Sequence, residues 1–177
     1  MAAKKYNFQQ FKEDTLNATC VAWRDDAAKG LAFPPDIEQR LQWAQTHTKM
    51  VDGDSVAYGI FEVGDDVATG ICEVALTRPG TRSAWVKMLS LHIRPALEVK
   101  LLQRDLESIE AALIVFSSAV HGSIKLKFEH KALTLKVYGR SNDQLDFLRA
   151  LALHLKPVLK NNAKCSIEGR WLAIKAP

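Results

Sequence analysis

Hydrophobic and polar residues alternate in three successive runs in the first half of the chain. The runs are SVAYGIFEV at 55–63, VATGICEVALT at 67–77 and SAWVKMLSLHI at 83–93. The turn-forming segments GDD and RPG separate them. The first two runs alternate only in part and the third is mostly apolar, which is typical of strands buried on both faces. We therefore predict a three-stranded antiparallel meander with helices on both sides.

Apolar residues recur every three or four positions in the segments that flank these runs, which predicts helices. Pro95 ends the third run, and Gly122 is a suitable stop for the helix that follows it. Pro157 is predicted to interrupt the last helix, which starts at Asn142 or Asp143. The predicted helices cover residues 7–29, 36–48 (with Asp36 as its cap), 97–120 and 142–156.

Strands are also predicted in the second half of the chain. SIKLKF at 123–128 and ALTLKVYG at 132–139 alternate and flank EHK, which predicts a half-exposed hairpin with Lys125 and Lys127 on its polar face. CSIEGRWLAIK at 165–175 predicts a closing strand. The fold class is then α/β (α+β), with a mixed, mainly antiparallel sheet, helices on both faces, and a single domain over residues 1–177.

Composition narrows the class of protein. The chain is 47% hydrophobic and 25% charged, which is typical of a globular domain. We find no apolar run of roughly 20 residues and no secretory signal, so we predict a cytoplasmic protein that does not enter a membrane. Cys20, Cys72 and Cys165 are far apart, which favours reduced core thiols. The histidine spacing fits no metal site, and no zinc-hydrolase, serine-hydrolase or P-loop motif occurs.

The order of these elements resembles that of the GNAT acetyltransferase superfamily over about residues 7–175. The local similarity is best at VAYGIFEV, VATGICEVAL and WVKMLSLHIRP, and it continues at LKVYGRSNDQLDFLRAL and GRWLAI. The resemblance implies an acyl-CoA-dependent N-acyltransferase that acts on an amine, with acetyl-CoA or another acyl-CoA as the cofactor. It also implies that the third strand of the meander splays from its neighbour and binds the pantetheine arm through its main chain. The corresponding residues here are Ser90, Leu91, Ile93 and Arg94.

Two positions differ from the pattern of that superfamily. There is no glycine between Gly80 and Gly122, where the superfamily has a glycine-rich turn that holds the pyrophosphate. Leu148 follows Phe147 where many members have a tyrosine that protonates the leaving thiolate. The sequence therefore leaves it open whether the chain is a divergent enzyme or a non-catalytic relative that binds a small ligand.

Three residues are candidates for acid–base chemistry. Glu73 lies within an apolar strand, where desolvation would raise the pKa of its carboxyl toward that of a working base. His92 lies near the end of the third strand, and Tyr138 ends a later one. Each also has an ordinary structural interpretation: an exposed glutamate, a half-buried histidine, or a tyrosine at a sheet edge.

Charge is distributed unevenly along the chain. Residues 1–98 contain 11 Lys and Arg against 13 Asp and Glu, whereas residues 99–177 contain 13 against 7. The hairpin predicted over 124–140 would gather Lys125, Lys127, Lys131, Lys136 and Arg140. The alternative functions are therefore a module that binds nucleic acid through this basic hairpin, and a homodimer that packs through the helix at 97–120. A solvated surface explains the same charges.

Overall fold

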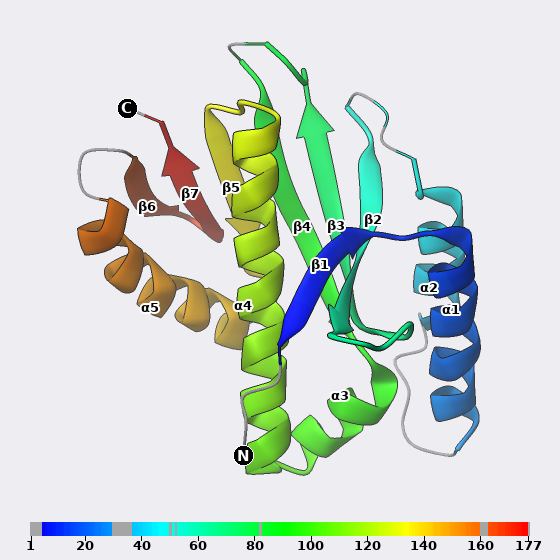
Figure 1. Cartoon of the computed structure of the whole chain (residues 1–177). Helices are drawn as coiled ribbons and strands as arrows, with labels where there is room; N and C mark the ends of the chain where they lie inside the picture. The colour runs from blue at the N-terminus through cyan, green and yellow to red at the C-terminus, as the bar shows by residue number, and fades with distance from the viewer. Residues whose placement is uncertain are drawn as a thin grey trace. The chain divides into compact units, whose positions relative to one another are not determined.

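The computed structural model describes residues 5–29, 37–49, 51, 53–81, 83–159 and 163–176. The predicted cap Asp36 lies outside these residues. Helices and strands follow one another along the chain as shown in Figure 1. Their bounds are β1 Tyr6–Gln10, α1 Glu13–Ala28, α2 Ile37–Thr46, β2 Ser55–Glu62, β3 Ala68–Thr77, β4 Trp85–Ile93, α3 Pro95–Leu102, α4 Leu106–Glu129, β5 Thr134–Tyr138, α5 Asn142–Leu159, β6 Lys164–Glu168 and β7 Trp171–Lys175.

The strands of the described residues form one seven-stranded sheet in the order β1-β2-β3-β4-β5-β7-β6. The β4–β5 pair is parallel, whereas β1–β2, β5–β7 and β6–β7 are antiparallel. This confirms the predicted mixed, mainly antiparallel α/β class, and β2, β3 and β4 are neighbours as the meander requires. The order of elements on which the GNAT resemblance depends is present.

The chain divides into two compact units. The first contains residues 1–50, 56–72 and 91–122, and the second contains residues 51–55, 73–90 and 123–177. The expectation of a single domain stays a prediction.

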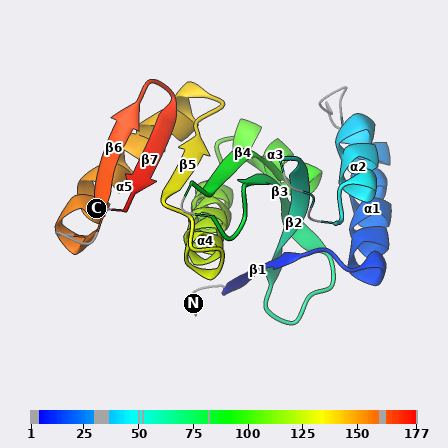
Figure 2. The ribbon, with the colours of Figure 1, turned by 90° about the horizontal axis from the view of Figure 1, so that it is seen from above.

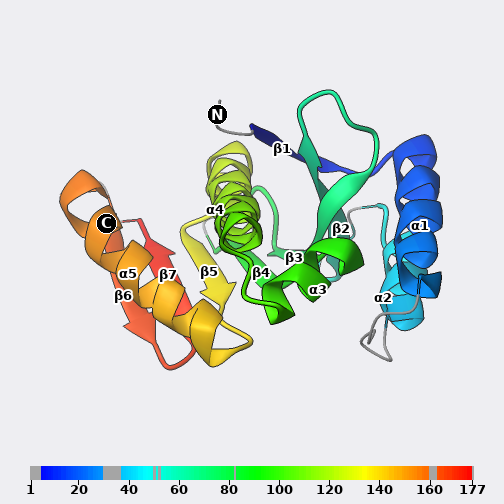
Figure 3. The same ribbon diagram turned by 90° about the horizontal axis from the view of Figure 1, so that it is seen from below.

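Strand β2 is buried on both faces in the first unit, as predicted. Ala57 and Phe61 pack into a cluster with α1 and α2, which Figures 2 and 3 show side by side. Tyr58 and Ile60 point to the opposite face. The cluster comprises Phe11, Leu16, Cys20, Trp23, Ile37, Leu41, Ala44, Ala57, Phe61, Ala68 and Ile71.

Helix α4 covers that opposite face in the first unit. Gly70 of β3 permits the approach, because a Cβ at this position would lie 3.0 Å from Val115 Cγ1 of α4 and 3.3 Å from Ile60 Cδ1. Gly122 permits a second approach, because a Cβ there would overlap the ring of Phe8 at 2.1 Å. The prediction that Gly122 ends the helix is therefore wrong: α4 continues to Glu129, and this glycine makes room for Phe8.

The N-terminal segment is a strand followed by a helix, and the prediction of one helix over 7–29 is wrong for its first residues. Strand β1 pairs with β2 from Tyr6↔Glu62 to Gln10↔Tyr58. Phe8 stacks on Tyr58 with 4.7 Å between the ring centroids. This pairing with a distant strand overrides the local helical spacing.

The predicted helix over 97–120 is divided into α3 and α4. The chain turns at Arg104, which has a φ of +57°. Asp105 then caps α4 by accepting hydrogen bonds from the N–H and the hydroxyl of Ser108, at 3.0 and 2.5 Å. The apolar spacing did not show this break, since it continues through both helices.

The predicted basic hairpin over 124–140 does not form, because residues 123–129 are the end of α4. Burial in this segment follows helical spacing: Ser123, Leu126 and Lys127 are buried, and Lys125 is exposed. Lys127 is therefore not on a polar hairpin face, and Lys125 and Lys136 lie on different kinds of element. The strand β5 begins only at Thr134, and it belongs to the main sheet.

Helix α5 packs on β6 and β7 in the second unit. It contains Pro157 inside its last turn, so the predicted interruption there is wrong. The predicted closing strand is two strands, β6 and β7, joined by a turn at Gly169 with a φ of +62°. The buried apolar side chains of this sheet include Leu135, Val137, Cys165, Leu172 and Ile174.

Candidate functional site

The end of β4 and the start of α3 form the candidate site in the first unit. The parallel pairing of β4 with β5 runs from Trp85↔Thr134 to Met88↔Val137, and β4 continues for five residues beyond it. The N–H of Arg94 donates to the carbonyl of Thr69 in β3 at 2.8 Å. Because successive peptide groups of a strand point to opposite edges, the N–H groups of Leu91 and Ile93 point away from β3.

The side chain of Arg94 is held by α1. Its Nε and Nη2 donate to the carboxylate of Asp26 at 2.6 and 3.3 Å. The exposed fractions of the two side chains are 32% and 10%. Asp26 thus balances the charge of Arg94, and the pair connects α1 to the junction of β4 and α3. Arg94 is a positioning residue in this geometry.

The start of α3 does not fit a pyrophosphate group. Pro95 occupies the first turn and has no N–H, and the N–H groups of Leu97 and Glu98 donate to the carbonyl of Arg94. Glu98 adds a negative charge to the same turn. Backbone N–H groups at a helix N-terminus bind phosphate only where they can reach it. The start of α3 therefore does not fit a diphosphate.

The start of α4 is closed to an anion as well. The carboxylate of Asp105 already accepts hydrogen bonds from the hydroxyl and the N–H of Ser108 there, and these bonds lower the pKa of Asp105. A second negative group would meet this carboxylate directly.

The structure brings two of the predicted site residues together in the second unit. The hydroxyl of Ser90 donates to Oε2 of Glu73 at 3.0 Å. Glu73 is half-buried and Ser90 is buried. Glu73 therefore has a neutral hydrogen-bond donor beside it, an arrangement that fixes the direction of its carboxylate.

The Ser90–Glu73 bond also indicates a shift in the alternation of β4. Thr77 of β3 and Trp85 and Lys87 of β4 line one pocket, so they share a face of the sheet. Glu73 is four residues before Thr77 in β3, so alternation places both side chains on the same face of the sheet. Ser90 is three residues after Lys87 in β4, so regular alternation would place its side chain on the other face, yet it contacts Glu73. The shift falls between Lys87 and Ser90, and it resembles the effect of a β-bulge.

The remaining predicted residues lie in both units. Leu91 is buried, and His92 and Ile93 are half-buried at the end of β4. Tyr138 belongs to the second unit, where its ring centroid lies 4.8 Å from that of Trp171. The acid–base roles of Glu73, His92 and Tyr138 stay predictions.

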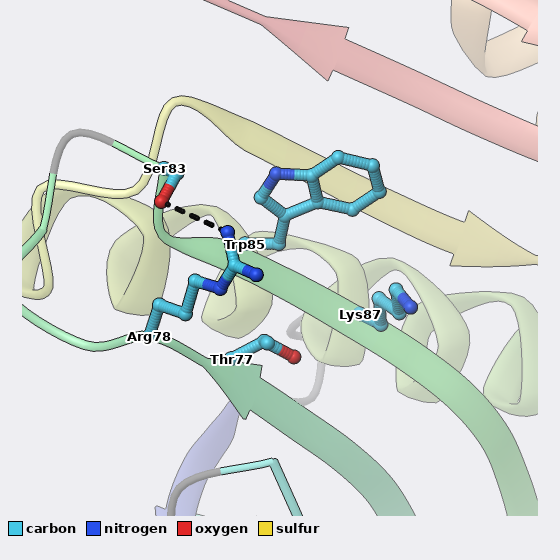
Figure 4. A pocket seen from close by; sticks show the side chains of 5 residues that line it. All are labelled: Thr77, Arg78, Ser83, Trp85 and Lys87. Atoms are coloured by element: carbon cyan, nitrogen blue, oxygen red, sulfur yellow. Dashed lines mark hydrogen bonds between the residues drawn. The ribbon is translucent and has the colours of Figure 1, made fainter.

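The pocket in the second unit was not predicted from the sequence. Thr77, Arg78, Ser83, Trp85 and Lys87 line an open hollow of about 270 Å³ (Figure 4). Trp85 stands above the sheet with 38% of its surface exposed. Two residues separated by one along a strand share a face, so Trp85 and Lys87 could have been paired from the sequence once their strand was recognised.

Within the described residues, no group of three or more His, Cys, Asp or Glu side chains could hold a metal ion. Helix α4 is apolar and long enough to cross a membrane, judged by its length and composition alone. Its Val115, Ala119 and Val120 are buried within the protein, and core helices of globular proteins meet the same criterion.

Comparisons with known proteins find similarity in structure alone. No family model matches the sequence, and no curated protein does. The chain is similar to an acetyltransferase from Thermus thermophilus, with 14% identity, coverage of 96% of this chain and 95% of that one, and a TM-score of 0.41. It is also similar to an acetyltransferase of the GNAT family from Staphylococcus aureus, with 8% identity, coverage of 97% and 99%, and a TM-score of 0.45. At these values the similarity does not assign this chain to a family or an activity.

Proposed function

We propose that this chain is a GNAT-like protein that binds a small, extended, amide-containing ligand along the end of β4. The observation that carries the proposal is that β4 continues to Ile93 after its pairing with β5 has ended at Met88, and its last residues, 91–93, lie in the first unit. The N–H groups of Leu91 and Ile93 point away from β3, toward the edge where such a ligand would lie. An extended amide chain can add to such an edge as another strand would.

The proposed ligand is of the pantetheine type rather than a complete coenzyme A. Pro95 removes an N–H from the first turn of α3, Glu98 adds a negative charge to it, and Asp26 balances the charge of Arg94, so these residues are unsuited to a diphosphate. The proposal is therefore a binding function, and acyl transfer by Glu73 or His92 is a separate prediction that does not follow from it.

Thermal unfolding with pantetheine and with coenzyme A tests the proposal. A ligand that binds only the folded chain raises its stability as RT ln(1 + [L]/Kd), so the midpoint should rise with millimolar pantetheine. Coenzyme A should bind with an affinity within about threefold of that of pantetheine, because its diphosphate finds no partner. Failure of both ligands to stabilise the chain would overturn the proposal. Binding of coenzyme A at least about tenfold more tightly would show a phosphate site and contradict the assignment of the ligand.

Amide chemical shifts give a matched control within the same strand. The N–H resonances of Leu91 and Ile93 should move when pantetheine is added. The N–H of Arg94 should move less, because it already donates to Thr69. Equal movement of all three, or movement of Arg94 alone, would place the ligand elsewhere.

A further inference from the structure

One face of the sheet in the second unit combines lysines with aromatic rings in three rows. The register of the strands defines the rows, because residues paired across strands point to the same face. The first row is Trp85, Thr134, Lys175 and Lys164; the second is Lys87, Lys136, Ala173 and Ser166; the third contains Tyr138, Trp171 and Glu168. We call this surface the lysine face.

The opposite face of the same strands is apolar and buried. Leu135 is paired with Ile174, and Ile174 with Cys165, and all three are buried. Helix α5 packs on β6 and β7, and its apolar residues Leu145, Leu148 and Ala152 are buried, so α5 covers this apolar side. The lysine face therefore points away from α5, and its Trp85 and Lys164 are exposed.

The charges of the lysine face do not balance. Lys87 is the direct cross-strand partner of Lys136, and Lys175 is that of Lys164. Like charges directly opposite one another destabilise a sheet. Within the three rows, Glu168 is the acidic residue: it binds Lys175 at 2.5 Å and Lys136 at 3.2 Å, and these lysines lower its pKa. Four lysines against one glutamate leave a surface that an anion would stabilise.

Trp85 is placed among these cations. Its ring centroid lies 5.5 Å from Nζ of Lys87 and 5.3 Å from Nζ of Lys136. The side chains of Arg78 and Ser83 lie beside it at the edge of the pocket (Figure 4). A base that stacks on this ring would bring its own phosphate within reach of the neighbouring ammonium groups.

We infer that the lysine face binds single-stranded nucleic acid, with a base stacked on Trp85 and phosphates on Lys87, Lys136, Lys164 and Lys175. A cationic groove with exposed aromatic rings is the combination that single-strand binders use. A duplex keeps its bases stacked inside and could use the lysines but not Trp85. This surface differs from the hairpin that the sequence predicted, and it does not depend on the site at the end of β4.

Fluorescence anisotropy of a labelled dT12 oligonucleotide at low salt tests the inference. The affinity should fall as salt rises, with a slope in log–log coordinates of about −2 to −3, as expected for three or four phosphate contacts to a single strand. Trp85→Ala should weaken binding at least about fivefold, whereas Trp85→Phe should retain most of it. Lys87→Ala should weaken binding and make the salt slope shallower by about 0.7.

Glu168→Gln should increase the affinity for the oligonucleotide, a result that is not expected if the lysines have only a structural role. It releases Lys136 and Lys175 from their acidic partner, so it should strengthen binding by about threefold and steepen the salt slope. Lys125→Ala is the matched control, because it removes the same charge from an exposed position on α4 and should change little. A circular dichroism melt of each variant establishes that it is folded.

Several results would overturn the inference. They are absence of dT12 binding at micromolar protein and low salt, equal losses in Lys87→Ala and Lys125→Ala, or weaker binding by Glu168→Gln. Equal affinity for a duplex of the same length, with no effect of Trp85→Ala, would show charge attraction without stacking. Binding to phosphatidylserine vesicles in the absence of dT12 binding would assign the face to a membrane surface instead.

Discussion

The ion pair between Arg94 and Asp26 should contribute strongly to the stability of the first unit. We consider Arg94→Met, which keeps most of the apolar stem of the side chain, and Asp26→Asn, which keeps its shape. The pair has two hydrogen bonds, of 2.6 and 3.3 Å, and its side chains are 32% and 10% exposed. Exposed pairs contribute about 0–1 kcal/mol, and breaking a buried pair costs about 3–5 kcal/mol, so a half-buried pair should give a coupling energy of about 2 kcal/mol.

Urea unfolding of the wild type, the two single variants and the double variant measures this coupling directly. Each single variant should lower the free energy of unfolding by about 2 kcal/mol, which corresponds to a melting temperature about 4–8 °C lower in a thermal melt. The double variant should lower the free energy of unfolding by little more than either single variant. A high salt concentration should weaken the coupling only in part, because Asp26 is nearly covered. A coupling energy below about 0.5 kcal/mol would refute the view that Arg94 acts through Asp26.

The same variants distinguish a structural role from a ligand-binding role. If Arg94 is a positioning residue, Arg94→Met should change the affinities for pantetheine and coenzyme A equally. A selective loss of coenzyme A affinity would show that the guanidinium contacts phosphate, and it would contradict the interpretation of this pair.

Two further substitutions test the cores of the units. Burial lowers the pKa of the Lys127 ammonium below its usual 10.5. The charged lysine therefore lowers the free energy of unfolding at any pH below its folded-state pKa, and this loss disappears as the pH rises from that pKa toward 10.5. Lys127→Met should raise the melting temperature at pH 7 by about 2–4 °C, and the melting temperature of this variant should rise less with pH than that of the wild type. Lys125→Met, at an exposed position, should change neither quantity. An equal effect of the two substitutions would contradict the prediction. In the first unit, the indole N–H of the fully buried Trp23 donates to the carbonyl of Ala68 at 2.8 Å. Trp23→Phe should lower the free energy of unfolding by about 2–4 kcal/mol, because it removes the donor to this carbonyl and leaves the core less well packed. A loss below about 0.5 kcal/mol in a urea titration would show that water or another donor replaces the indole.

The elements of the meander could be predicted from the sequence because their signals are local. The segments at 55–63, 67–77 and 83–93 correspond to β2, β3 and β4 within two residues at each end. Alternation, β-branched residues and the turns at GDD and RPG all favoured the same state there. Helices α1 and α2 were predicted for a similar reason, apart from the N-terminal strand.

Prediction failed where two periodicities fitted the same residues. SIKLKF alternates like a strand, yet its buried Ser123 and Lys127 are four apart, as in a helix. Gly122 is a common helix stop, but the ring of Phe8 occupies the space that a side chain would need. In both segments the outcome depends on a partner far along the chain, so no local window contains the deciding information.

By itself, the sequence determined the fold class, the meander and the lack of a glycine-rich turn after β4, since periodicity and glycine content are properties of neighbouring residues. Only the tertiary structure decided that Ser90 meets Glu73, that Asp26 holds Arg94, and that Lys136 joins Lys87 and Trp85 on one face. The physical reason is strand register: a shift of one residue moves every side chain to the other face, and this register is set by packing among segments that are distant in sequence.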